Sequence, residues 1–215
     1  HGDEVAAIVM EPVRNKKPSP SFFKTIDKYK KKHNTILIID EISSGFRLLT
    51  GGAHLKYGIK PDVAVFSKGL GNGYPISAIL GKSEIMSAAE KTFLSSTNWT
   101  ERIGPTAALA MIQKHKKFQV SEHLHQLGKK VQNGWKSIAS LYNIKITVSG
   151  IYPMSSFSFL EKDPLILRAY FVQEMLKDNI LAGSQFYAMY SHSYNNVERY
   201  LDSVEKIFKK MKSLI

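Results

Sequence analysis

The sequence predicts an α/β fold in which part of a parallel sheet is followed by a smaller α+β region. Two observations carry this prediction. In the first half of the chain, continuous apolar runs alternate with helical patterns, which is typical of strands buried on both faces of a parallel sheet. In the second half, apolar and polar residues alternate within short runs, which indicates half-exposed strands.

The first half contains the strands and helices of the predicted sheet domain. Val5–Met10 (VAAIVM) is predicted as a buried strand, and an amphipathic helix follows from about Ser19 to Lys32. The β-branched run TILIID ends at Asp40 and VAVFS begins at Val63, and both are predicted as further buried strands. Helical patterning then dominates residues 104–142.

The second half changes in character. IKITVSG and SSFSFL alternate like half-exposed strands, DPLILRAYFVQEMLKDN has a helical pattern, and a terminal helix is predicted from Asn195. We therefore place residues 1–117 in the sheet domain and residues 118–215 in connecting helices and a small C-terminal domain.

Composition narrows the classes of function. The absence of cysteine excludes disulfides, thiolate catalysis and cysteine-based zinc sites, and we expect a reducing, cytoplasmic location. No apolar run reaches the roughly 18 residues of a membrane span. The net charge of +12 would suit an anionic partner, but the lysines alternate with apolar residues at helical spacing, which indicates solvated faces of amphipathic helices. A basic nucleic-acid-binding module therefore stays a weaker alternative.

Several motifs resemble known sites without having their spacing. GLGNGY lacks the G-x-G-x-x-G order of a dinucleotide turn, and LGKS would need a glycine at Ile76 to complete a phosphate-binding loop. His123 and His125 lie in a helical pattern, where residues two apart face different directions, so we expect no shared metal. No G-x-S-x-G elbow of a hydrolase is present.

An acid and a lysine follow two successive predicted strands. Asp40 ends one strand and Lys68 follows the next, and ligands of open α/β sheets bind beyond the carboxyl ends of the strands. A lysine in a partly apolar pocket can act as an amine nucleophile, and an aspartate can hold the ring nitrogen of a pyridine cofactor protonated. A helix-capping Asp40 and a surface Lys68 are equally compatible with the pattern.

Four elements carry a family resemblance: MEPV at Met10–Val13, IIDEISSGFR, PDVAVFSKGLGNGYPISAILG and SSTNWTERIGPTAALA. In their order and spacing they resemble the class III, pyridoxal-phosphate-dependent aminotransferases, especially the glutamate-1-semialdehyde aminotransferase (aminomutase) branch. The resemblance implies a fold-type-I enzyme that transfers amino groups with pyridoxal 5'-phosphate. It is specific across Met10–Ala110 and looser in the C-terminal part.

The resemblance implies roles for individual residues. Lys68 matches the lysine that holds the cofactor as a Schiff base, and Asp40 matches the partner of the pyridine nitrogen. Ile42 matches the apolar residue that packs on the ring, and Thr97 matches the phosphate-binding residue supplied by the neighbouring subunit. Glu11 matches the Glu of the Glu-Pro element, for which we expect a structural role. The implied partners are a small-molecule amino donor, a carbonyl acceptor and a second copy of the chain, without membrane or nucleic acid.

The sequence also departs from the family. Ser43 stands where many members have a Gln that contacts the ring hydroxyl, and NWTERIGP replaces the familiar GGNP. We expect the chain to be the C-terminal portion of such an enzyme, so that residues 1–117 are the end of its large cofactor-binding domain and the upstream phosphate loop is missing. Two alternatives stay open: an aminomutase, which returns the amino group to another carbon of the same molecule, and a truncated scaffold without activity.

Overall fold

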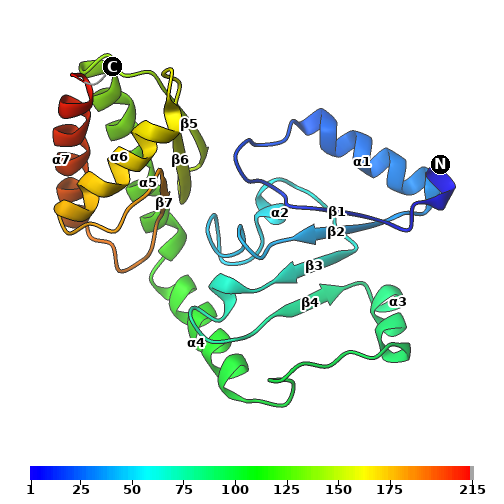
Figure 1. The fold of residues 1–215 in the computed structure, drawn as a ribbon. Coiled ribbons are helices and arrows are strands. Elements are labelled where there is room, and N and C mark those ends of the chain that lie inside the picture. Colours follow the sequence, from blue (N-terminus) through cyan, green and yellow to red (C-terminus); the bar gives the residue numbers. More distant parts are fainter. Residues whose placement is uncertain (214–215) are drawn as a thin grey trace. The chain divides into compact units, whose positions relative to one another are not determined.

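The computed structural model describes residues 1–213 and divides into two compact units, His1–Glu122 and His123–Ile215 (Figure 1). In chain order the first unit contains η1 (Gly2–Glu4), β1 (Ala7–Met10), α1 (Pro20–His33), β2 (Ile36–Asp40), α2 (Ala53–Lys56), β3 (Val63–Phe66), η2 (Lys68–Leu70), β4 (Ala78–Gly81), α3 (Ser83–Met86), η3 (Ser87–Lys91) and α4 (Ile103–Lys117). Then follow α5 (Val120–Leu141), β5 (Ile146–Ile151), β6 (Met154–Phe159), α6 (Pro164–Lys177), β7 (Gln185–Tyr187) and α7 (Tyr194–Met211).

The sheet of the first unit has the strand order β1-β2-β3-β4. β1, β2 and β3 run parallel, which confirms the predicted α/β class, but β4 pairs antiparallel with β3. The sheet is therefore mixed, with an antiparallel strand at this edge. The reason is the short connection between Phe66 and Ala78, which is long enough for an antiparallel return but not for a helical crossover.

The first strand is also less buried than predicted. Ile8 and Met10 pack against Leu37 and Ile39, whereas Val9 points to the opposite face and is 66% exposed. The prediction that the strands are buried on both faces therefore fits β2 and β3 better than it fits β1.

Local sequence signals explain where α1 begins and ends. The Ser19 side chain accepts a hydrogen bond from the backbone N–H of Phe22 at 3.2 Å, and Pro20 occupies the first helical position. Asn34 ends the helix in the left-handed conformation with φ of 51°. One face of α1, with Phe23 and Ile26, packs on the sheet.

The second unit is an antiparallel sheet, in the order β5-β6-β7, packed with α5, α6 and α7 (Figure 1). β5, β6, α6 and α7 lie where the sequence predicted them, while the three-residue strand β7 was not predicted. Its core is aromatic: Phe157 packs edge to face on Trp135, with ring centroids 4.9 Å apart, and on Phe171, at 5.3 Å. The buried Trp135 indole donates a hydrogen bond to the hydroxyl of Tyr200 at 2.9 Å.

The boundary predicted between residues 117 and 118 follows the end of α4, and the compact units divide within the first turn of α5. Whether the two units correspond to a large cofactor-binding domain and a small domain remains a prediction.

Candidate active site

The carboxyl ends of β2 and β3 bring the acid and the lysine to one edge of the sheet. The two strands are parallel neighbours, and Asp40 lies opposite Val65 in their register. Asp40 is the last residue of β2, and Lys68 begins η2 directly after the short link from β3. Ligands of α/β proteins bind at this edge. The structure therefore gives Asp40 and Lys68 the common location that the strand pattern predicted.

Lys68 has an unusual backbone and a defined side-chain partner. Its φ of 41° lies in the left-handed region, which costs an L-residue with a side chain roughly 1–2 kcal/mol. The exposed Lys68 Nζ donates a hydrogen bond to Ser43 Oγ at 2.7 Å. Strain of this kind in a residue other than glycine is typical of functional sites.

Asp40 is half-buried and closes the turn that follows β2. Its Oδ1 accepts a hydrogen bond from the backbone N–H of Ile42 at 2.8 Å, so this carboxylate shapes the turn. The Ile42 side chain is half-buried in the same turn. The carboxylate and the apolar side chain are thus held in one short segment.

The neighbouring acid, Glu41, has a role that the sequence pattern does not reveal. Its side chain is fully buried, and Oε1 accepts the backbone N–H of His54 at 2.7 Å and lies 2.8 Å from His54 Nδ1. Oε2 accepts the hydroxyl of Ser44 at 2.6 Å. Glu41 therefore ties the Asp40 turn to the start of α2. The acidic pair Asp40–Glu41 at a strand end was the available signal, but it does not show which of the two acids is buried.

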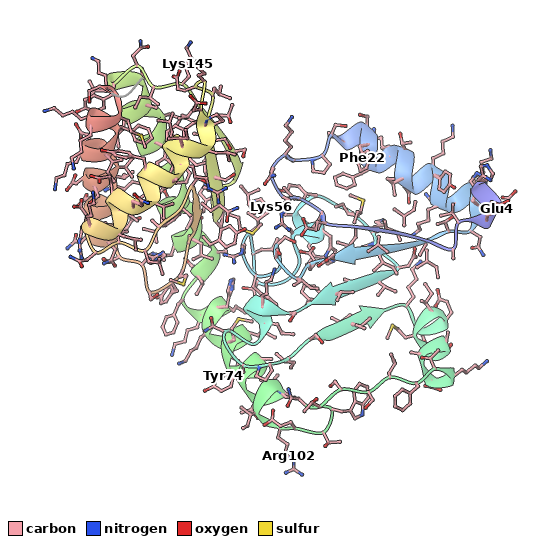
Figure 2. The ribbon with its side chains drawn as sticks, in the orientation of Figure 1. Glu4, Phe22, Lys56, Tyr74, Arg102 and Lys145 are labelled. Atoms are coloured by element: carbon pink, nitrogen blue, oxygen red, sulfur yellow. The ribbon has the colours of Figure 1, made fainter. Side chains whose placement is uncertain are left out.

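The glycines after Lys68 permit close backbone contacts. A Cβ on Gly71 would lie 2.2 Å from the carbonyl oxygen of Tyr74, and one on Gly104 would lie 2.8 Å from that of Pro75. The glycine-rich turn, where Tyr74 lies, and the start of α4, next to Arg102, are therefore packed together (Figure 2).

The opposite end of β3 carries an ion-pair network. Asp62 is buried and lies 2.6 Å from the Lys30 amine and 2.7 Å from that of Lys82, and it accepts the backbone N–H of Leu37 at 2.8 Å. Burial alone would raise the pKa of Asp62, but these hydrogen bonds and charges lower it to about 2. Because Asp62 precedes β3 while Lys68 follows it, we interpret this network as structural.

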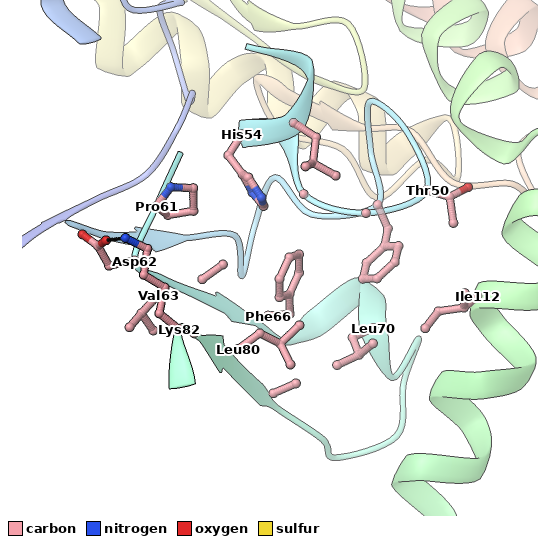
Figure 3. A pocket seen from close by; sticks show the side chains of 17 residues that line it. Thr50, His54, Pro61, Asp62, Val63, Phe66, Leu70, Leu80, Lys82 and Ile112 are labelled. Carbon is pink, nitrogen blue, oxygen red and sulfur yellow. Dashed lines mark ion pairs between the residues drawn. The ribbon is translucent and has the colours of Figure 1, made fainter. Parts of the chain in front are cut away.

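A largely apolar cavity of about 660 Å³ lies in the first unit (Figure 3). Its floor is made by Ala64 and Phe66 of β3 and by Leu80 of β4, and His54 points into it. Lys68 and Asp40 do not line this cavity, so we do not assign the candidate active site to it.

Two other predicted residues lie on different segments. Thr97 is exposed, in a turn formed by residues 97–100 between η3 and α4. Among the described residues no hydrogen bond joins Thr97 to Lys68 or Asp40. Glu11 follows β1, and its carboxylate accepts a hydrogen bond from Arg14 at 2.6 Å.

The two close histidines point to different partners. His123 Nε2 lies 2.9 Å from the carbonyl oxygen of His192, and the His125 ring packs edge-on against Tyr152 with centroids 4.7 Å apart. Within residues 1–213, no group of three or more histidine or acidic side chains is arranged to hold a metal ion. Over the same residues, no helix combines the length and apolar character required to cross a membrane.

The family model "Aminotransferase class-III" matches residues 1–183. The chain belongs to the class III aminotransferase family. Glutamate-1-semialdehyde 2,1-aminomutase of Persephonella marina is 29% identical to this chain. The match covers 98% of this chain and 54% of the aminomutase. The 3-aminobutyryl-CoA aminotransferase of Cloacimonas acidaminovorans is 24% identical, over 99% of the chain and 54% of that protein. The chain thus spans about half the length of the curated relatives it matches.

Solved structures show the same fold. The FumI protein of Sphingopyxis sp. MTA144, in its PLP internal aldimine form, superimposes with a TM-score of 0.91 at 22% identity, over 97% of this chain and 52% of that one. An omega-transaminase from Sphaerobacter thermophilus gives a TM-score of 0.86 at 19% identity, over 97% and 53% of the two chains. The class III family member therefore has the α/β fold of the PLP-dependent transaminases, which confirms the predicted fold-type-I class.

Proposed function

We propose that this chain carries the lysine anchor of an aminotransferase that uses pyridoxal 5'-phosphate. The observation that carries the proposal is the placement of Lys68 and Asp40 after adjacent parallel strands, in a member of the class III family. The side chains at this edge suit the cofactor chemically, since a primary amine can bind its carbonyl carbon and a carboxylate can hold its ring nitrogen protonated.

Four residues of the chain would bind the cofactor or move a proton. When bound, the cofactor supplies a ring that withdraws electrons from the substrate carbon. Lys68 would hold the cofactor covalently and, once released, would move a proton at Nζ. Asp40 would keep a positive charge on the ring nitrogen, while Ile42 would cover one face of the ring. Thr97 would bind the phosphate of the neighbouring subunit's cofactor, because a hydroxyl donates a hydrogen bond to phosphate without changing its own charge.

The complete protein would act on a small-molecule amino donor and a carbonyl acceptor. It would be a cytoplasmic homodimer, since the Thr97 assignment requires a site completed across a two-fold interface. Dilution of the dimer should then weaken cofactor binding. A Thr97→Val variant should lose cofactor more readily while retaining its thermal stability.

A second candidate is an aminomutase. It is favoured by the relatives themselves, several of which are glutamate-1-semialdehyde 2,1-aminomutases. The two activities differ in stoichiometry, because a transaminase requires a separate amino donor and acceptor whereas an aminomutase rearranges one molecule. Turnover of a single amino aldehyde without an added second substrate would favour the aminomutase.

Borohydride trapping tests the proposed function. The chain is mixed with pyridoxal 5'-phosphate, its absorption spectrum is recorded, and the reduced adduct is located by peptide mass spectrometry. We expect a yellow adduct that reduces onto Lys68 and is absent from Lys68→Ala. Labelling spread evenly over exposed lysines such as Lys56 and Lys91, with no preference for Lys68, would leave the inactive-scaffold alternative standing. Steeply salt-dependent DNA binding without colour would favour the basic module.

A further inference from the structure

A side-chain hydrogen bond joins the two turns at the edge of the sheet. Ser43 lies in the turn after β2 and Lys68 lies after β3, 25 residues further along the chain, and their side chains meet at 2.7 Å. The neighbouring serine, Ser44, points elsewhere, because its hydroxyl donates to the buried carboxylate of Glu41. Two adjacent serines thus have different partners.

Backbone contacts hold both ends of this pair in place. The Ser43 carbonyl accepts a hydrogen bond from Arg47 Nε at 2.9 Å, and the turn is closed by the Gly45 N–H, which donates to the Glu41 carbonyl at 2.8 Å. On the other side, the Lys68 carbonyl accepts the N–H of Asn72 at 3.0 Å. The hydroxyl and the amine therefore face each other from ordered backbone, although the lysine tip itself is exposed.

A hydroxyl is a suitable partner for a nucleophilic amine. A free lysine side chain gives up about 2 kcal/mol of rotamer entropy when it is fixed, so a contact made before the reaction removes part of that cost. A carboxylate would also fix the amine but would favour its charged, unreactive form. Ser43 can accept from the ammonium or donate to the neutral amine, whereas the nearby Asp40 carboxylate is engaged by the Ile42 N–H.

We propose that Ser43 is a positioning residue for Lys68, holding the amine at the strand edge so that it attacks an aldehyde carbon presented there. In the attack a nitrogen–carbon bond forms and the carbonyl carbon–oxygen bond breaks. The carbonyl oxygen leaves as water with both amine hydrogens, so no oxidant or reductant is needed. This role rests on the proposed function of Lys68 as the covalent anchor.

The test compares four forms of the full chain: the unchanged chain, Ser43→Ala, Ser43→Thr, which keeps a hydroxyl, and Ser44→Ala, which removes the neighbouring hydroxyl. Two rates are measured at Lys68 by peptide mass spectrometry. The first is condensation with pyridoxal 5'-phosphate followed by borohydride trapping. The second is acetylation by dilute acetic anhydride, a small neutral reagent, expressed relative to the exposed Lys56. Thermal melting of each variant reports whether the fold is retained.

We expect opposite effects on the two rates. In Ser43→Ala the amine is no longer directed, so condensation should fall about 10-fold while acetylation of Lys68, relative to Lys56, should rise about 3-fold. Ser43→Thr should restore condensation to within about 3-fold, and Ser44→Ala should change it by less than about 2-fold. This split would not follow from a general loosening of the turn, which would alter both serine-to-alanine variants alike.

Two outcomes would overturn the positioning role. One is an equal loss of condensation in Ser43→Ala and Ser44→Ala. The other is a parallel fall of condensation and acetylation in Ser43→Ala. If the unchanged chain fails to condense with pyridoxal 5'-phosphate at Lys68, the proposed function fails. The ratio of Lys68 to Lys56 acetylation then tests the contact between Ser43 and Lys68 by itself. In that case an unchanged Lys68 to Lys56 ratio in Ser43→Ala would show that Ser43 does not hold the amine.

Discussion

The two units of the chain bury their side chains very differently. Large apolar groups fill the second unit, where Trp135, Phe157, Phe171 and Phe208 are fully or almost fully buried. The first unit has two smaller apolar clusters, around Ile39 of β2 and Phe66 of β3, together with the apolar cavity. Three apolar strand residues of this unit are more than half exposed: Val9 (66%), Ile79 (52%) and Leu80 (60%).

Two buried carboxylates add polar connections to these apolar clusters. The Glu41 carboxylate links the turn after β2 to α2, and the Asp62 carboxylate links α1 with β2, β3 and Lys82. Lys68, with its strained backbone, also lies in the first unit. The unit that carries the candidate site thus combines small apolar clusters with directional contacts to buried carboxylates, whereas the second unit has a larger aromatic core. We expect mutations to separate these two modes of stabilisation.

The largest expected effect is on the aromatic core. Phe157→Ala should lower the free energy of unfolding of the second unit by about 3–5 kcal/mol, because it removes a ring that packs on several other aromatic side chains. Urea denaturation followed by the fluorescence of the buried Trp135 measures this loss. Leu70→Ala, at the wall of the existing cavity, should cost only about 2 kcal/mol. Equal losses in the two variants would remove the contrast between the cores.

Glu41→Ala should have the next largest effect, about 3 kcal/mol, because it leaves the half-buried His54 N–H and the buried Ser44 hydroxyl without their acceptor. Hydrogen exchange of the His54 amide should accelerate strongly in this variant. The exposed Glu84 provides the control, since Glu84→Ala should leave both stability and exchange nearly unchanged. Unaltered protection of His54 in Glu41→Ala would show that the buried carboxylate does not hold the turn.

Sequence patterns predicted the strands whose own residues favour an extended, buried conformation. β1, β2 and β3 are continuous β-branched or apolar runs, and each lies within the residues predicted for it. β4 and β7 escaped prediction because most of their residues are exposed, and their extended form depends on pairing with β3 and β6. Such pairing is a tertiary effect that a local pattern does not contain.

The candidate site could be predicted only in part for the same reason. Strand order gave Asp40 and Lys68 a common edge, since parallel neighbours end on the same side. The partner of Lys68 could not be predicted, because Ser43 is 25 residues away and adjacent to an equally plausible serine. Glu41 likewise has a partner, His54, that lies 13 residues later, and no periodic pattern connects the two.

The Asp62 network should make the first unit sensitive to acid. Because the pKa of Asp62 is lowered to about 2 from an ordinary value of 3.8, its contribution is complete above pH 4 and is lost as the pH falls towards 2. The shift corresponds to about 2 kcal/mol. Denaturation of the unchanged chain and of Asp62→Asn between pH 6 and pH 2 should show a difference that shrinks across this window. A difference that stays constant to pH 2 would mean that the carboxylate is not stabilised by Lys30 and Lys82.

The smallest expected effect isolates the strain at Lys68. Both Lys68→Ala and Lys68→Gly remove the amine and its contact with Ser43, so they differ chiefly in the backbone. Alanine normally stabilises a chain relative to glycine by about 0.5–1 kcal/mol, because glycine loses more freedom on folding. At a φ of 41° the order should reverse, with Lys68→Gly more stable than Lys68→Ala by about 1 kcal/mol. Lys56, in the short helix α2, gives the matched pair, and there the alanine variant should be the more stable one. If alanine is preferred at both positions, Lys68 is not strained, and the first unit does not store energy at its candidate active site. A reversal at Lys68 alone would show that the side chain of this candidate residue is kept in the first unit at the expense of stability.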